Sequence, residues 1–255
     1  MENETGLKVF FWIGTAIMLL MTLLVVFLTI IYQKKLHKIK QAESENLLKA
    51  SMESEKRERK RIASDIHDGI SGDLNAIRNY VTFLDQKEKD TNNKPVFNEI
   101  KSALDNVLTD VQDISYNLMP PTFEDLGLIP TLEEYFNKVS KWNNITVTSS
   151  YYRKDIPISA SNAYEIYRII QELISNSIKH GNSSTVDCSF QENNDKIEIN
   201  IADNGIPFDY YENLKNASGM GLKNILSRTK LINASLIQIH AEKGNKIQIQ
   251  LKKHQ

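Results

Sequence analysis

A run of 23 residues without a charged side chain, residues 9–31, constrains the fold of this chain more than any other feature. At about 1.5 Å rise per residue, a helix of this length is long enough to cross a hydrocarbon layer of about 30 Å. The run is too long for the core of a signal peptide, and no small-residue cleavage site follows it. It therefore predicts one N-terminal transmembrane helix.

The charges on either side of the run predict its orientation. Four lysines lie between residues 34 and 40, whereas Lys8 is the only one before the run. Because positive residues stay on the cytoplasmic side, we expect a single pass through the cytoplasmic (inner) membrane with the N-terminus outside. Residues 1–8 would form a short extracytoplasmic tail, so the chain would have no extracytoplasmic sensor domain of its own.

Composition limits the class of protein. The chain has 255 residues, 41% of them hydrophobic and 25% charged, and a formal charge of -1, which suits a folded protein of one or two domains. This near-neutral balance does not indicate direct nucleic-acid binding. The single cysteine, Cys188, rules out an internal disulfide and a cysteine-rich metal site, and its alternation with Val186 and Phe190 predicts a buried thiol.

Residues 32–60 are highly charged and contain neither glycine nor proline, so we expect a juxtamembrane signalling helix. A coiled-coil signal conduit and a merely solvated helix fit this composition equally. Residues 61–120 then predict a helical hairpin, whose first helix carries Ile62, Ile66 and Ile70 on one stripe. Apolar residues recur in the second helix with alternating spacings of three and four, at Phe97, Ile100, Leu104, Val107, Val111, Ile114 and Leu118. This spacing is typical of a bundle seam, so we expect the hairpin to dimerise into a four-helix bundle.

Residues 121–255 have a different pattern. Strands are predicted where polar and apolar residues alternate, at 186–190, 197–201, 236–240 and 247–251, with a further strand near residue 145. Helices are predicted at 132–142, 160–179 and 222–232. The expected fold is an α+β sandwich, with one sheet and helices on one of its faces.

The first candidate for chemistry is the pair His67 and Asp68, at the edge of the apolar stripe of the first helix. A carboxylate beside an imidazole can hold one ring N–H, which leaves the other nitrogen a better nucleophile. A lone His-Asp pair on an amphipathic helix is more often an ordinary surface pair, so its weight depends on the rest of the chain.

Three polar motifs follow in the α+β part. Glu172, Asn176, Lys179 and His180 fall on one helix face, where amide and carboxylate oxygens suit Mg²⁺ that is held mainly by substrate phosphates. Asp203-Asn-Gly205 follows a strand, where a carboxylate can accept a hydrogen bond from a purine amino group; a tight turn explains the same residues. Gly219-Met-Gly221-Leu222 opens a helix whose N–H groups favour phosphate, although a flexible loop gives the same motif.

The order of these motifs resembles the sensor histidine kinases of two-component systems, in particular the subfamily whose dimerisation helix carries His-Asp-x-x-x-Gln. The resemblance covers about residues 55–251. It rests on the motifs above and on Arg61-Ile62-Ala63 before Ile66-His67-Asp68, on the linker Leu118-Met-Pro-Pro-Thr-Phe-Glu-Asp-Leu-Gly-Leu128, and on Arg228. The polar face of residues 172–180 resembles the N box of that family.

The resemblance implies a gyrase-like ATP-binding domain that transfers the γ-phosphoryl group of ATP to His67, with Asp68 as the base. Asn176 with Glu172 would hold Mg²⁺, Asp203 with Gly205 would bind adenine, and Gly219, Gly221 and Leu222 would form a lid over the phosphates beside Lys179 and His180. The homodimer would then pass the phosphoryl group to an aspartate of a separate response regulator, often a DNA-binding one, and a membrane sensor protein is a further possible partner. The chain departs from the family at Gly72, which replaces the glutamine.

Two other functions fit parts of the same sequence. A membrane-anchored, nucleotide-binding scaffold would couple without phosphotransfer, although His67 and Asn176 are both present. An ATPase of the same fold would need a carboxylate that activates water, for which Glu172 is the candidate, and it would leave the His-Asp helix without a purpose.

Overall fold

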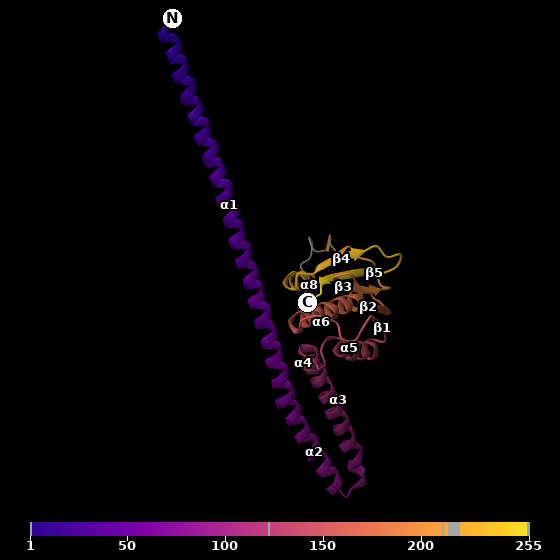
Figure 1. Ribbon diagram of the computed structural model, residues 1–255. Coiled ribbons are helices and arrows are strands. Elements are labelled where there is room, and N and C mark those ends of the chain that lie inside the picture. Colours follow the sequence, from indigo (N-terminus) through magenta and orange to yellow (C-terminus); the bar gives the residue numbers. More distant parts are fainter. Residues whose placement is uncertain (1, 122, 211, 214–219, 254–255) are drawn as a thin grey trace. The chain divides into compact units, whose positions relative to one another are not determined.

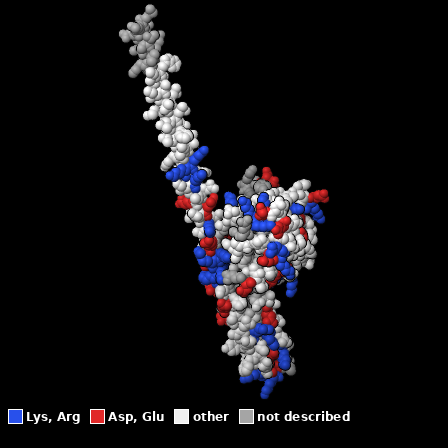
Figure 2. Space-filling view, in the orientation of Figure 1, with Lys and Arg blue, Asp and Glu red and all other residues white. Residues whose placement is uncertain are grey.

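The computed structural model describes residues 2–121, 123–210, 212–213 and 220–253. The chain forms two compact units, residues 1–52 and 53–255. The first belongs to helix α1 (Glu2–Asp65), which includes the uncharged run. By length and composition, this is the one helix among the described residues that is apolar enough to cross a membrane. Figure 2 shows a stretch of α1 without charged surface, followed by a band of lysine and arginine.

The second unit begins with the predicted helical hairpin. After α1 come a π-helical turn (Ile66–Ile70) and α2 (Ser71–Lys87), then a short 3-10 turn (Thr91–Asn93) and α3 (Lys94–Leu118). The side chain of Asp90 accepts a hydrogen bond from the backbone N–H of Asn92, which closes the turn. Pro95 lies in the first turn of α3, where its missing N–H leaves no helical hydrogen bond unmade.

The α/β part has one five-stranded sheet (Figure 1). Its strands are β1 (Thr146–Tyr151), β2 (Thr185–Asn193), β3 (Lys196–Asp203), β4 (Ser235–Ile239) and β5 (Asn245–Lys252), in the order β1-β2-β3-β5-β4. Strand β1 pairs parallel with β2, and the other pairs are antiparallel, so the sheet is mixed. In the described residues of this part, helices with defined bounds are α4 (Phe123–Leu126), α5 (Leu128–Asn143), α6 (Ala160–Lys179) and α8 (Met220–Leu231).

One hydrophobic core joins the sheet to the helices. Alternate residues of β2, β3 and β5 are buried, among them Cys188, whose thiol is fully enclosed as predicted. The polar residues between them, such as Glu198 and Gln248, form the other face of the sheet and bond to one another. The core continues into the hairpin through Tyr116 and Met119 near the end of α3. The α/β part therefore packs directly against the end of the hairpin.

Candidate functional site

His67 lies in the π-helical turn, a break in the regular hydrogen bonding between α1 and α2. The backbone N–H of Ser71 bonds to the carbonyl of Ile66, five residues back, instead of four. Single π-helical turns inside α-helices occur frequently at functional sites. The widened turn leaves the side chain of His67 66% exposed and that of Asp68 74% exposed.

The two side chains form the pair that the sequence predicts. Nδ1 of His67 lies 3.1 Å from Oδ1 of Asp68, and the Ser64 hydroxyl donates to Oδ2 of Asp68 at 3.0 Å. These bonds from His67 and Ser64 hold the pKa of the Asp68 carboxyl below its ordinary value. Because an ionised carboxylate only accepts, Nδ1 carries the proton and Nε2 keeps its lone pair for chemistry.

A groove of about 210 Å³ lies beside this pair, and we call it the His67 groove. One wall comes from Lys60, Ala63 and Ser64. The other comes from Ser115 near the end of α3 and from Met119, Pro120 and Pro121 directly after it. The Ser115 hydroxyl donates to the backbone carbonyl of Ala63 at 2.9 Å and ties the two walls together.

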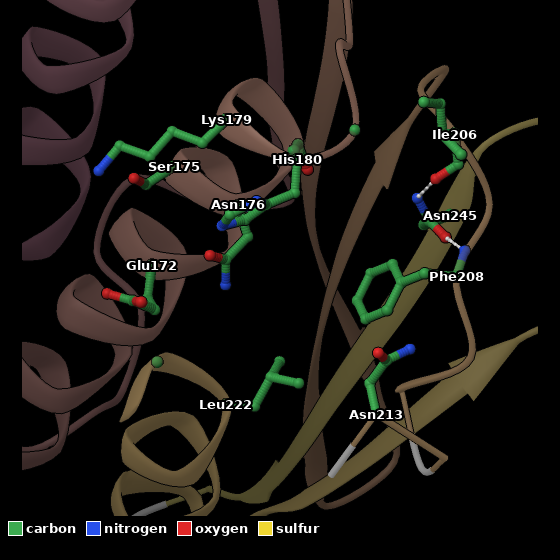
Figure 3. Close-up of a pocket in the computed structure, with 13 residues that line it drawn as sticks. Glu172, Ser175, Asn176, Lys179, His180, Ile206, Phe208, Asn213, Leu222 and Asn245 are labelled. Atoms are coloured by element: carbon green, nitrogen blue, oxygen red, sulfur yellow. Dashed lines mark hydrogen bonds between the residues drawn. The ribbon is translucent and has the colours of Figure 1, made fainter. Parts of the chain in front are cut away.

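A larger cavity of about 530 Å³ lies against α6, and we call it the α6 cavity (Figure 3). The predicted polar face lines it, because Glu172, Asn176, Lys179 and His180 all lie on the same side of α6 or directly at its end. Gly221 and Leu222, at the start of α8, line it as well. In Figure 3 the Asn176 amide points into the space between α6, Leu222 and Phe208.

Asp203 lies one layer behind the wall of the α6 cavity. Its carboxylate accepts hydrogen bonds from the hydroxyls of Ser177 (2.8 Å) and Ser183 (3.2 Å), from the Gly205 backbone N–H (2.9 Å) and from the Asn245 amide (3.2 Å). Ser177 and Asn245 line the cavity themselves. The four donors hold the carboxylate in one orientation, directly behind the surface that a ligand would touch.

Two glycines of the site allow neighbouring parts of the chain to approach the backbone closely. A Cβ at Gly205 would collide with the Ser183 hydroxyl and the Gly181 carbonyl, and a Cβ at Gly221 would collide with the Glu172 carboxylate. The Glu172 carboxylate thus lies against the backbone at the start of α8. Gly219, the other predicted glycine of this loop, lies outside the described residues.

Glu172 is the one carboxylate among the described residues that line this cavity, and the Asn176 amide lies one helical turn from it on α6. No cluster of three or more His, Cys, Asp or Glu side chains suited to a metal occurs in the described part of the chain. The two oxygens fit Mg²⁺, which keeps several waters and binds substrate phosphates, better than a metal enclosed by protein.

Sequence reasoning missed several residues of this site. Asn245 donates to Asp203 and to the Ile206 carbonyl (3.0 Å), and its oxygen accepts the Phe208 N–H (2.9 Å), so it organises the loop after β3. The sequence does contain a signal for Asn245, because this polar residue takes an inward position in the alternating pattern of β5, together with the buried Ile247 and Ile249. Phe208 and Gly181 carry no comparable signal.

Known proteins match both parts of the second unit. Residues 58–123 match a family described as histidine kinase, and residues 161–255 match the family of histidine kinase-, DNA gyrase B- and HSP90-like ATPases. The oxygen sensor histidine kinase NreB of Staphylococcus carnosus is 28% identical over 196 residues, 74% of this chain and 54% of NreB. The sensor histidine kinase ComP of Bacillus subtilis is 27% identical over 206 residues, 77% of this chain and 26% of ComP.

Among solved structures, the histidine kinase domain of the blue-light activated kinase from Erythrobacter litoralis EL346 has a TM-score of 0.47 at 12% identity, over 71% of this chain and 94% of that one. The chain spans only about half and a quarter of the lengths of NreB and ComP. The two family matches cover the His67 turn and the α6 cavity in the order that the motifs predict. The chain belongs to the sensor histidine kinases.

Proposed function

We propose that this chain is an ATP-dependent protein-histidine kinase that phosphorylates its own His67. The observation that carries the proposal is the His67–Asp68 pair, an exposed imidazole whose Nδ1 is fixed 3.1 Å from a carboxylate. Nε2 attacks the γ-phosphorus of ATP, an N–P bond forms, the bond to the β-phosphate oxygen breaks and ADP leaves. Asp68 stabilises the positive charge that develops on the ring and accepts its Nδ1–H.

The roles in the α6 cavity follow from the chemistry of its walls. Asn176 and Glu172 would hold Mg²⁺, which neutralises the phosphate charge during transfer. Lys179 and His180 would add charge near the phosphates. Gly221 and Leu222, with Gly219, would form the lid over them.

The adenine end of the cavity would be the loop after β3. Asp203 with Gly205 would receive the adenine amino group through the hydrogen-bonded layer of Ser177 and Asn245. Phe208 and the 58% exposed Ile206 give this end an apolar surface on which a purine ring can pack.

The working molecule would be a homodimer of the hairpin. Besides the residues that pack between α2 and α3, large apolar side chains seven residues apart are exposed. They are Ile70 in the π-helical turn with Ile77 and Leu84 on α2, and Ile100, Val107 and Ile114 on α3. Side chains seven apart lie on one helix face, and a monomer leaves both stripes in water. A second copy would cover them in a four-helix bundle.

The phosphoryl group would then pass from His67 to an aspartate of a separate cytoplasmic response regulator, whose output can be DNA binding. The kinase would be anchored in the cytoplasmic membrane by residues 9–31, with residues 1–8 outside and residues 32–60 as the signalling helix. Residues 61–120 would be the dimerisation and phosphotransfer domain, and residues 121–255 the ATP-binding domain. A membrane sensor protein would be a further partner.

Incubation of the full chain with γ-labelled ATP and Mg²⁺ tests the proposal. We expect label on the protein that is acid-labile and alkali-stable, as a phosphoramidate is. His67→Gln should abolish the label but keep ATP binding, because the imidazole lies outside the α6 cavity. Asn176→Ala should lose the label because the metal is misplaced. Free phosphate instead of labelled protein would indicate an ATPase, and the absence of both products would indicate a scaffold. Label that persists in His67→Gln would refute the assignment.

A further inference from the structure

A cavity of about 380 Å³ lies between the linker after α3 and the start of α6, and we call it the linker cavity. Part of its wall comes from residues between 123 and 130, in α4 and the first turn of α5, and part from residues between 154 and 163, which lead into α6. Lys56, near the end of α1, lines it as well. All of these residues belong to the second compact unit. Among the described residues, the linker cavity shares no lining residue with the α6 cavity or the His67 groove.

Most of the surface inside the linker cavity is apolar. Phe123, Leu128 and Ile129 are buried members of the hydrophobic core, and Ile156 and Ile158 pack against the same core. A ring or short hydrocarbon chain in the cavity would cover these side chains and gain the free energy of apolar burial. At about 30 Å³ for each non-hydrogen atom, which is the volume of a water molecule in the liquid, the cavity holds about a dozen such atoms.

Two lysines give the linker cavity a positive rim. The ammonium group of Lys56 lies 4.6 Å from the centre of the buried Tyr164 ring, a cation–π contact that holds it beside the cavity. Lys154 is exposed on the loop before α6. Neither lysine forms an ion pair with a carboxylate that the structure describes. Asp155 also lines the cavity, but its carboxylate is fully exposed and lies 3.8 Å from the Arg153 guanidinium, which offsets its charge.

The start of α5 adds to the same attraction. Gly127, the residue before α5, has no side chain that could cap the helix, and Gly127, Leu128 and Ile129 all line the cavity. The first backbone N–H groups of a helix have no acceptor within it and carry the positive end of the helix dipole. A carboxylate at the start of α5 would therefore accept hydrogen bonds from the backbone beside the two lysines.

We propose that the linker cavity binds a small carboxylate whose apolar body has about a dozen non-hydrogen atoms. The apolar side chains around Phe123 cover the body of the ligand, and Lys56 and Lys154 neutralise its carboxylate. A cation of the same shape would be repelled by the two ammonium groups. This site goes beyond the proposed kinase function and does not depend on it, because no residue assigned to phosphoryl transfer lines the cavity.

The test is equilibrium dialysis of the full chain in lipid nanodiscs against 2-naphthoate, which matches the cavity in size and charge, with binding to empty nanodiscs subtracted. We expect one molecule per chain with a Kd of about 0.1 mM, a strength that ligands of this size reach. A saturating ATP analogue that is not hydrolysed should leave the Kd unchanged, because the α6 cavity is separate. The cation 2-naphthylmethylammonium should bind at least about tenfold more weakly. The absence of saturable binding, displacement by the ATP analogue or equal binding of the cation would overturn the proposal.

Two variants locate the probe in the linker cavity. Lys56→Gln combined with Lys154→Gln should raise the Kd for 2-naphthoate about tenfold, because both positive charges are lost. The control, Lys87→Gln combined with Lys89→Gln, removes the same charge from the end of the hairpin and should match wild type. Ala160→Leu places a larger side chain in the cavity from an exposed position at the start of α6, and it should raise the Kd at least as much. Wild-type affinity in either cavity variant would show that the probe binds elsewhere.

Hydrogen exchange of the wild type gives a readout that needs no variant. Saturating 2-naphthoate should slow the exchange of backbone amides in residues 126–129 several-fold, because the ligand has to leave before this segment opens. Residues 94–104 of the hairpin, which do not line the cavity, should exchange at an unchanged rate. Equal exchange in residues 126–129 with and without the probe would refute the site.

Discussion

At the scale of single residues, the glycines divide into two kinds that the sequence alone does not separate. Gly181 and Gly205 are enclosed, and a Cβ on either would meet backbone or hydroxyl oxygens. Gly69 and Gly72, near His67, have nothing within 4 Å of a Cβ. Close packing among the described residues therefore does not explain the two glycines beside His67. These two glycines can instead make the helix more flexible or allow another molecule to approach it.

Gly205→Ala should weaken nucleotide binding, because the new methyl group displaces the Ser183 hydroxyl and the loop that holds Asp203. The measurement is the affinity for a fluorescent ATP analogue. We expect a loss of at least about tenfold, which corresponds to about 1.4 kcal/mol of binding free energy. Gly69→Ala is the control, since its methyl group enters open space. Unchanged affinity in Gly205→Ala would show that the loop tolerates the displacement and that its packing is not needed for binding.

Gly72 bears on dephosphorylation of the response regulator. In the family an amide at this position is implicated in that reaction, where it can orient a water molecule for in-line attack. Gly72 has no side chain for this role, so we expect weak phosphatase activity from the wild type. A Cβ at Gly72 would meet nothing within 4 Å, and Gly72→Gln removes a destabilising glycine worth about 1 kcal/mol. The variant should accelerate decay of the phosphorylated regulator in the presence of ADP. Strong decay with wild type and no gain in the variant would contradict this.

The sequence predicted the site residues whose spacing places them on one helix face, and it missed Asn245 on β5 and the loop residues Phe208 and Gly181. The spacing of Glu172, Asn176 and Lys179 places them on one face of a helix whatever its surroundings, and the structure brings them together on α6. Phe208 and Gly181 line the same cavity because of the conformation of their loops. A periodic sequence pattern does not predict that conformation. Asp203 was placed correctly at a strand end, but of its four donors only Gly205 is near it in the sequence, whereas Ser177, Ser183 and Asn245 are 20 or more residues away.

At the scale of elements, the hairpin shows what a periodic pattern can and cannot resolve. The alternating three-four spacing predicted α3 and its apolar seam, and the helix is as long as expected. The pattern could not tell which residues pack against α2 within the chain. In the structure Leu104 and Val111 are partly covered and Leu108 is buried, whereas Ile100, Val107 and Ile114 are 40–54% exposed. Both faces are apolar, so only the observed packing separates them.

The exposed stripe predicts a mutation that affects association but not folding. Val107→Glu should convert a dimer of residues 53–255 into a monomer, because an unpaired charge buried in the bundle costs several kcal/mol. The unfolding temperature of the monomeric Val107→Glu fragment should remain close to that of other monomeric variants of the same fragment. Sedimentation at micromolar concentration measures the first property and circular dichroism the second.

Val111→Glu is the matched control, since Val111 faces the interior of the hairpin and is only partly exposed. It should lower the unfolding temperature of the fragment as well as its association. A wild-type fragment that sediments as a monomer would count against the bundle itself.

At the scale of the whole molecule, one helix contains both the uncharged run and the approach to His67. Helix α1 extends without interruption to Asp65, and the π-helical turn continues it into α2. Composition predicted this continuity, because residues 32–60 lack glycine and proline. The contact between Glu55 and Arg228 was beyond prediction, since the two residues lie 173 positions apart and neither belongs to a spacing pattern.

The proposed activity requires that residues 53–255 face the compartment that contains ATP. The lysines that follow the uncharged run predict this orientation. A fluorescent protein fused to the C-terminus should therefore fluoresce, and alkaline phosphatase fused there should be inactive, because its disulfides form only outside the cytoplasm. Replacing the four lysines between residues 34 and 40 with glutamine, and adding lysines among residues 2–7, should move both reporters towards the opposite result. Active phosphatase on the wild-type chain would place the α6 cavity away from ATP, and the kinase mechanism would then fail together with the orientation.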